Sequence, residues 1–268
     1  MRTNLLKEKI ARGEPSRGIW LGLPSAFSAR LLARTPVDWL VIDAEHAPIG
    51  VETLAQMVSA IAEANGPAPL VRIAQASVMN IKYALDAGAH GIIAPMINTR
   101  EEAEWVVAWA KFPPEGLRSF GSAYPGLAFD MSMPEYLQHA NQQTLVMVQI
   151  ESRAALDNLD EIFAVPGIDM AFVGPVDLSI SLGLEAFPPE NQHPTFLEAI
   201  EEVKRAAAKH NLPLGIYCSS GKAAAERIRE GFQFVNAASD VLMLGRGVQG
   251  ELEASKAVDV PAQSGGGK

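Results

Sequence analysis

The chain has 268 residues and a formal net charge of -9, with 31 Asp and Glu against 22 Lys and Arg. This balance argues against a nucleic-acid partner, whose binding surface is normally basic. A single cysteine, Cys218, excludes an intramolecular disulfide and fits a reducing compartment. The first residues lack the continuous apolar run of a signal peptide, and no run reaches the roughly 18 to 20 residues of a membrane span. We therefore expect a soluble, cytoplasmic protein with no membrane partner.

Short apolar runs alternate with longer segments of helical periodicity, a pattern typical of a parallel sheet covered by helices. Eight runs separated by helices predict an α/β protein with a single closed (β/α)8 TIM barrel. The expected strands are 18–23, 38–42, 69–73, 91–94, 145–150, 170–173, 214–217 and 232–237. The expected helices are 25–34, 50–64, 78–87, 99–110, 154–163, 194–210 and 222–230.

Residues 111–141 interrupt this alternation between the fourth and fifth strands. Long connections in compact domains are usually functional or disordered. The aromatic residues of this segment and Arg118 favour an ordered lid or an interface. With no linker in view, we expect one barrel domain over residues 1–260, followed by a flexible Gly- and Ser-rich tail over 261–268.

Active sites of such barrels lie at the carboxyl ends of the strands. Glu151 directly follows the fifth strand and Asp177 follows the sixth, so two neighbouring strands each end near a carboxylate. Oxygen ligands of this kind suit Mg²⁺, Mn²⁺ or Co²⁺, with water and a bidentate 2-oxo acid completing the coordination. The alternative interpretation is that each carboxylate caps the helix that follows it.

The second strand ends in Asp43 and is followed by Glu45 and His46. A histidine with an ordinary pKa of about 6.5 can act as a proton shuttle, and either carboxylate could orient it. The alternative is a loop histidine bonded to a neighbouring carboxylate. Arg72 interrupts the third apolar run and needs an anion, because a buried strand does not tolerate an unpaired charge. That anion is either a substrate carboxylate or Glu45.

No lysine occupies a predicted strand. A Schiff-base aldolase needs a lysine that projects into the barrel, so this absence favours a metal as the electron sink. Two weaker features follow the seventh strand. Ser219 and Ser220 precede a helix and are more simply explained as caps than as an anion site. Cys218 is more simply a packed small residue than a nucleophile.

Several of these residues fall in longer motifs that resemble the HpcH/HpaI aldolase family, to which hydroxy-oxo-heptanedioate aldolase, deoxy-rhamnonate aldolase and, as a relative, macrophomate synthase belong. The resemblance runs over roughly 18–244, nearly the whole chain. The motifs are 18–22 (GIWLG), 38–48 (DWLVIDAEHAP), 116–118 (GLR), 149–151 (QIE) and 172–179 (FVGPVDLS).

The resemblance implies a barrel of the pyruvate/phosphoenolpyruvate type and a class II aldolase that cleaves or forms 4-hydroxy-2-oxo acids through a pyruvate enolate. It implies a divalent metal at Glu151 and Asp177, and His46 as the acid/base residue beside Asp43 and Glu45. It also implies that Arg72 stabilises the enolate.

In the same way, Gln149 with Gly174 and Pro175 would bind the substrate. The partners would be a 2-oxo acid and an aldehyde. The family further implies a homo-oligomer, a trimer or a hexamer, with the last helix exchanged between subunits.

The sequence departs from the family pattern at 217–221, 236–240 and 123–133, regions that the resemblance places at the aldehyde end of the pocket. The metal and enolate chemistry therefore transfers better than the identity of the aldehyde. An oxaloacetate decarboxylase or macrophomate synthase-like enzyme with the same site stays open as an alternative, as does a non-catalytic barrel.

Overall fold

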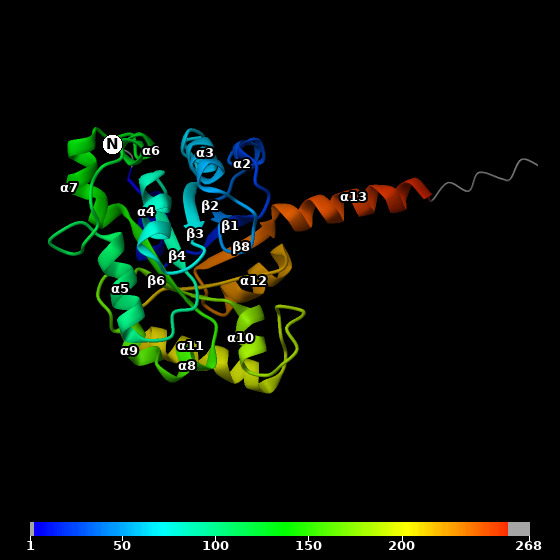
Figure 1. The fold of residues 1–268 in the computed structure, drawn as a ribbon. Coiled ribbons are helices and arrows are strands. Elements are labelled where there is room, and N and C mark those ends of the chain that lie inside the picture. The colour runs from blue at the N-terminus through cyan, green and yellow to red at the C-terminus, as the bar shows by residue number, and fades with distance from the viewer. Residues whose placement is uncertain (1–2, 257–268) are drawn as a thin grey trace, which may run out of the picture.

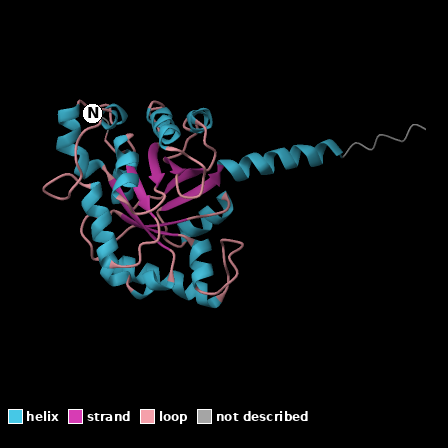
Figure 2. Cartoon of the chain, in the orientation of Figure 1, coloured by secondary structure: helices cyan, strands magenta, loops and turns pink. Residues whose placement is uncertain are grey.

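The computed structural model describes residues 3–256, in which eight parallel strands close into a barrel surrounded by helices (Figures 1 and 2). Each strand pairs with the next along the chain, and the last pairs with the first. The predicted barrel is therefore confirmed. The strands are β1 (Ser16–Leu21), β2 (Trp39–Asp43), β3 (Ala68–Arg72), β4 (Gly91–Ala94), β5 (Leu145–Ile150), β6 (Met170–Val173), β7 (Leu214–Ile216) and β8 (Phe234–Ser239).

Most helices also lie where periodicity predicts them. These are α2 (Ala26–Leu32), α3 (Val51–Ala62), α4 (Val78–Asp86), α5 (Arg100–Ala110), α11 (Pro194–His210) and α12 (Gly221–Arg229). The single helix expected over 154–163 is wrong. The segment instead forms two short helices, α8 (Arg153–Asp157) and α9 (Leu159–Phe163). They meet at Asn158, whose side chain donates to the Asn98 carbonyl at 2.9 Å instead of facing solvent.

Side chains at alternate strand positions fill the barrel interior. Trp39 of β2 stacks face to face on Phe234 of β8, with ring centroids 3.8 Å apart. Gly18 of β1 makes room for this pair, because a Cβ there would clash with the indole ring of Trp39. The interior at the amino end of the strands is thus a tightly packed aromatic layer, which is expected of small barrels that form a core rather than a pore.

The helix α1 (Leu5–Ala11), which the sequence pattern did not predict, closes the amino end of the barrel. Leu6 and Ile10 are buried and join the same apolar cluster as Trp39. Asn4 caps the helix and donates from its Nδ2 to the His90 carbonyl at 3.1 Å, just before β4. Its two buried residues lie on one face, and only the barrel they cover makes a helix of this length stable.

Residues 111–141 are ordered, as predicted, and contain two unpredicted helices, α6 (Tyr124–Ala128) and most of α7 (Met133–Gln143). They lie at the amino end of the strands, where the His90 ring contacts the Ala128 carbonyl at 3.2 Å. Arg118 is buried there and binds Asp86 at 3.0 Å.

The amino end is opposite the carboxyl ends of the strands, where the barrel opens into a cavity. None of residues 111–141 lines that cavity. The lid interpretation and the role of 123–133 in shaping that pocket are therefore wrong for this chain. The interface interpretation stays a prediction.

The carboxyl-terminal helix α13 (Asp240–Lys256) projects away from the barrel (Figure 1). It leaves large apolar side chains exposed, among them Leu244, Val248 and Leu252. No helix within residues 3–256 is long and apolar enough to span a membrane. The predicted tail over 261–268 lies outside the described residues, and the single domain over 1–260 stays a prediction.

Candidate active site

Strand alternation delivers polar side chains to the carboxyl end of the barrel. Along β2, Trp39 and Val41 fill the interior, and Asp43 continues the same inward face at the strand end. Arg72 and Gln149 take the equivalent places in β3 and β5. The apolar core and the polar rim are therefore made by the same inward-facing rows of residues.

These side chains line a cavity of about 720 Å³. Of the site residues predicted from the sequence, those that line it are Asp43, His46, Arg72, Gln149, Gly174, Pro175 and Asp177, whereas Glu45 and Glu151 do not. The walls also include residues that the sequence analysis missed. They come from the β6–β7 connection and from the start of α13, and are Phe187, Pro188, Pro189, Val241, Leu242 and Arg246. No lysine lines the cavity, in keeping with the lysine-free strands.

One wall of the site is a buried ion cluster centred on Arg72. Its Nε donates to Asp43 Oδ1 at 2.9 Å, and Nη2 donates to Oδ2 at 2.5 Å, a bidentate pair. Nη1 lies 3.0 Å from Glu45 Oε2, and Trp20 Nε1 donates to Asp43 at 3.0 Å. Burial alone would raise the pKa of Asp43, but the Arg72 guanidinium holds it below its usual value.

The sequence left open which anion binds Arg72, and the structure shows two protein carboxylates, Asp43 and Glu45. Glu45 does bind it, but Asp43 binds it more fully, because the two residues are register partners in neighbouring strands. The Arg72 side chain is only 10% exposed, so both carboxylates are needed to offset the cost of burying its charge. This network fixes the guanidinium beside the cavity.

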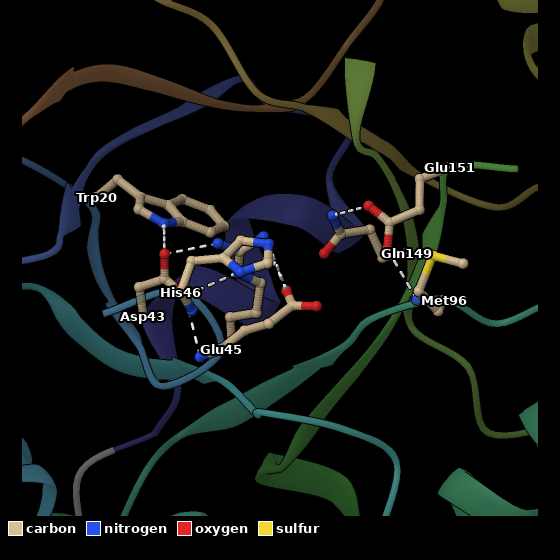
Figure 3. Close-up of polar contacts among 8 residues, drawn as sticks. Trp20, Asp43, Glu45, His46, Met96, Gln149 and Glu151 are labelled. Atoms are coloured by element: carbon tan, nitrogen blue, oxygen red, sulfur yellow. Dashed lines mark hydrogen bonds and ion pairs between the residues drawn. The ribbon is translucent and has the colours of Figure 1, made fainter. Parts of the chain in front are cut away.

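His46 lies in the loop after β2, with its side chain 62% exposed (Figure 3). Its Nε2 is 3.8 Å from Glu45 Oε2. Asp43 accepts the backbone N–H of His46, not the imidazole, at 3.2 Å. Glu45 is therefore the carboxylate that faces the ring, and Asp43 instead shapes the loop that carries it.

Glu151 lies beyond Gln149 from this cluster (Figure 3), behind the cavity wall that Gln149 forms. Its Oε1 accepts the backbone N–H of Met96 at 2.8 Å, and its Oε2 accepts from Gln149 Nε2. Gly174 leaves the space for this pair, because a Cβ there would clash with both side chains. Burial raises the pKa of Glu151 to about 7, and the nearby carboxylates of Asp177 and Glu45 add to the shift.

Neither Glu151 nor Asp177 acts as a helix cap, so the capping alternative is wrong. Ser152, not Glu151, caps α8. Asp177 is in the first turn of α10 (Pro175–Ser181), a helix that the sequence analysis missed. The residue before that helix is Gly174, and no side-chain cap bond is formed. Neither carboxylate is therefore used as a cap, although both oxygens of Glu151 accept hydrogen bonds, from Met96 and from Gln149.

The composition of this end of the cavity fits an oxygen-binding cation. The buried Oε1 of Gln149 has no hydrogen-bond partner. Glu151 and Asp177 repel each other electrostatically, a cost that a bound cation would remove. Within residues 3–256, no three His, Cys, Asp or Glu side chains are grouped closely enough to hold a metal ion. Two carboxylates would therefore bind together with water or substrate oxygens.

The loop after β7 contributes structural side chains and one tyrosine. Ser220 caps α12 by accepting the N–H of Ala223, which confirms the capping interpretation. Cys218 is buried, and burial raises the pKa of its thiol to about 12, in line with a packed residue. Tyr217 lines the cavity. The resemblance places 217–221 beside the pocket, and Tyr217 and Ser219 of this segment do line it.

The fold is that of a (β/α)8-barrel enzyme, and the candidate reacting groups lie at the carboxyl ends of its strands. The family model described as HpcH/HpaI aldolase/citrate lyase matches residues 17–245. The chain belongs to this family, which confirms the resemblance drawn from the motifs, and it is a carbon–carbon lyase.

The alignments with similar proteins extend over nearly the whole barrel. The chain is 41% identical to a hydroxypyruvate/pyruvate aldolase of Rhizorhabdus wittichii over 87% of its length and 90% of the relative. It is 38% identical to a 4-hydroxy-2-oxo-heptane-1,7-dioate aldolase of Klebsiella pneumoniae, over 92% and 91% of the two chains. A crystal structure of macrophomate synthase aligns with a TM-score of 0.85 at 30% identity, covering 94% of this chain and 88% of that one.

Proposed function

We propose that this protein is a class II aldolase that cleaves or forms 4-hydroxy-2-oxo acids by way of a pyruvate enolate, with a divalent metal as its cofactor. One observation carries the proposal. A fixed guanidinium, Arg72, and the carboxylate of Asp177 line one cavity, and the Glu151 carboxylate lies against Gln149 of its wall, close enough for Asp177 to raise its pKa. A cation and an arginine together suit a reaction in which charge develops on a carbonyl oxygen.

The metal would be held by Glu151 and Asp177, and Mg²⁺, Mn²⁺ or Co²⁺ would suit these oxygen ligands. When bound, it would polarise the carbonyl of the 2-oxo acid as a Lewis acid. The raised pKa of Glu151, about 7 without a cation, supports this role. The hydrogen bonds from Met96 and Gln149 hold the carboxylate in one orientation for its ligand.

The 2-oxo acid would be bound by Arg72, Gln149 and the backbone at Gly174 and Pro175. These residues support the proposal because all four line the cavity. Arg72 would lie beside the oxygen on which negative charge develops, and its partners Asp43 and Glu45 would keep it from moving as the charge forms. Preorganised charges of this kind typically lower a barrier by several kcal/mol.

Proton transfer would fall to His46, with Glu45 as its orienting carboxylate. In the cleavage direction the imidazole would remove the proton of the 4-hydroxyl group, and the aldehyde would leave. In the reverse direction it would return that proton. The exposed position of the ring supports this role, because it lets protons exchange with solvent.

The same site could generate the enolate by decarboxylating oxaloacetate, so this activity is the alternative within the same chemistry. The alignment with macrophomate synthase favours keeping it as a second candidate. A non-catalytic barrel is disfavoured, because buried ionised groups are costly and are retained here around an open cavity.

We also propose that the protein is a homo-oligomer, a trimer or a hexamer. The apolar residues along α13, among them Leu244, Val248 and Leu252, have no partner in the described part of the chain and would be covered by a second copy. Exchange of α13 between subunits, which the family implies, would bury them.

The test is pyruvate release from a 4-hydroxy-2-oxo acid, with EDTA and then with Mn²⁺ or Mg²⁺ added. Release that is abolished by EDTA and restored by the metal is expected. Decarboxylation of oxaloacetate without any aldol cleavage would favour the second candidate. Inactivity on both substrates with every metal would contradict the proposal and revive the non-catalytic barrel.

A further inference from the structure

Trp20, the tryptophan of the 18–22 motif, is tightly packed in the wall of the cavity. It lies on β1 with only 5% of its surface exposed, and it joins the same apolar cluster as Trp39. Its indole stacks on Phe172 of β6 with ring centroids 5.6 Å apart, and it packs edge-to-face with the ring of Tyr217 at 5.7 Å. These contacts leave the indole little room to move.

The indole N–H of Trp20 binds the same carboxylate as Arg72 (Figure 3). Its Nε1 donates to Asp43 Oδ2 at 3.0 Å, and Oδ2 is also the oxygen that accepts from Arg72 Nη2. Asp43 is buried, so a carboxylate oxygen shared by two fixed donors has few other positions open to it. The tryptophan therefore orients the carboxylate that in turn orients the guanidinium.

The ring of Trp20 also contacts Arg72 directly. The guanidinium carbon Cζ lies 5.0 Å from the centroid of the indole ring, within the range of a cation–π contact. Asp43 accepts hydrogen bonds from two nitrogens of the guanidinium, and Glu45 pairs with the third. The indole adds a contact that uses none of the N–H donors. It therefore holds the guanidinium in place and leaves its remaining donors to a ligand.

The proposed task of Arg72 makes its orientation important. A preorganised charge lowers a barrier most when it does not have to move as the reaction proceeds. An arginine side chain has several rotatable bonds, and a group at a reacting centre must stay within about 0.5 Å of its productive position. Trp20 meets this need, because it is fixed by its own packing against Phe172 and touches both members of the Asp43–Arg72 pair.

On these grounds, and resting on the proposed aldolase function, we infer that Trp20 is a positioning residue that holds the Arg72 guanidinium, through Asp43 and through its ring, in the orientation that binds the enolate oxygen. It acts through Arg72 and not through the proposed metal ligands, Glu151 and Asp177. Loss of the indole should therefore weaken binding of the enolate more than binding of pyruvate, whose carbonyl oxygen carries less negative charge.

The probe is oxalate, a planar dianion with the shape of the pyruvate enolate. Calorimetry gives the Kd of oxalate and of pyruvate for the full-length protein loaded with Mn²⁺, and exchange of the pyruvate methyl protons with deuterated water reports enolate formation. Trp20→Phe, which keeps a ring and removes the N–H, should weaken oxalate binding roughly fivefold and pyruvate binding less than about twofold. Trp20→Leu, which removes both contacts, should weaken oxalate binding roughly tenfold or more. Proton exchange should fall with oxalate affinity, and the affinity for Mn²⁺ should not change.

A double-mutant cycle with Arg72→Gln separates positioning from a general structural role. If Trp20 acts through Arg72, Trp20→Phe should have little further effect on oxalate binding once the guanidinium is gone. The same loss in the Arg72→Gln background would overturn the inference, because Trp20 would then act on the ligand itself or on the fold. Unchanged oxalate binding in both Trp20 variants would overturn it as well, as would an equal loss of oxalate and pyruvate affinity.

The matched control is Trp109→Phe. Trp109 lies on α5, outside the cavity, and its substitution should leave the ratio of the oxalate and pyruvate Kd values unchanged. Failure of the proposed function gives a different result. The unaltered protein, loaded with Mn²⁺, would then neither bind oxalate nor exchange the methyl protons of pyruvate, whatever residue stands at position 20.

Discussion

The two ends of the barrel interior are built from the same strands and have opposite chemistry. At the amino end, Trp39 stacks on Phe234, and Leu6 and Ile10 cover them. At the carboxyl end, only four residues further along β2, Asp43 binds Arg72 in a buried ion pair. One inward-facing row of residues therefore packs the core at its start and carries candidate site residues at its end. This division is what the location of active sites in such barrels requires.

The largest loss of activity is expected at the carboxyl end of the barrel, where we place the metal ligands. Glu151→Gln would keep the shape of the side chain but remove a metal ligand. Loss of a bound cation costs several kcal/mol of stabilisation, so pyruvate release should fall about 10³-fold. The measurement is kcat/KM at a Mn²⁺ concentration that just saturates the unaltered enzyme. Glu161→Gln, an exposed residue of α9 outside the cavity, is the matched control. Normal turnover by the Glu151 variant would contradict the assignment.

The next prediction concerns the amino end. Trp39→Ala removes a fully buried ring and should lower the free energy of unfolding by about 3 to 5 kcal/mol. Chemical denaturation measures the change. Phe27→Ala removes an aromatic ring that is 85% exposed and should change the free energy by less than about 0.5 kcal/mol. Equal losses in the two variants would show that the interior layer does not stabilise the barrel as described.

His46→Ala separates proton transfer from metal binding. General acid–base residues typically contribute at least about 10²-fold, so aldol turnover should fall by about that factor, with the affinity for Mn²⁺ unchanged. Steady-state kinetics and a metal titration measure both quantities. The control is His139→Ala in α7, outside the cavity. A variant that lost metal and activity together would make His46 a ligand instead.

The smallest predicted effect is a pH dependence of stability that arises from Lys111, a buried lysine at the amino end of the barrel. Lys111 donates to the carbonyls of Asn141 and Thr144, and burial lowers its pKa to about 8. Because the unfolded chain holds this proton more tightly, the charged form costs stability below the folded pKa, and the cost is relieved as the pH rises. The free energy of unfolding should therefore gain about 1 kcal/mol between roughly pH 7 and pH 9.

Lys111→Met should remove this gain, because its side chain cannot titrate. Denaturation of both proteins at the two pH values isolates the contribution of Lys111 from that of other groups. The same gain in the variant would show that other groups, and not Lys111, cause it.

The strands were predictable because their residues are apolar on both faces, and their ends differ from the prediction by at most two residues. The missed helices have another origin. α1 has two buried side chains, and α6 has five residues, so neither shows a clear helical period. Their stability comes from the surfaces they contact, which sequence patterns do not display.

For the site, the carboxyl-end residues were predictable from their positions just after strands. Their partners were not. Asp43 meets Arg72 because β2 and β3 pair in a particular register, which the residue types alone do not fix. Likewise, one of the two donors to Glu151 is a backbone N–H, that of Met96, which no side-chain pattern signals. The 187–189 segment, which no motif marks, reaches the cavity only through the closure of the barrel.

The central claim is that the carboxyl end of the barrel holds one metal ion between Glu151 and Asp177. Its most direct test is a titration with Mn²⁺ in which the loss of the electron paramagnetic resonance signal of the free ion is followed. The unaltered protein should bind one ion per chain, and Glu151→Gln and Asp177→Asn should each bind it at least roughly tenfold more weakly. Unchanged binding in both variants would contradict the claim.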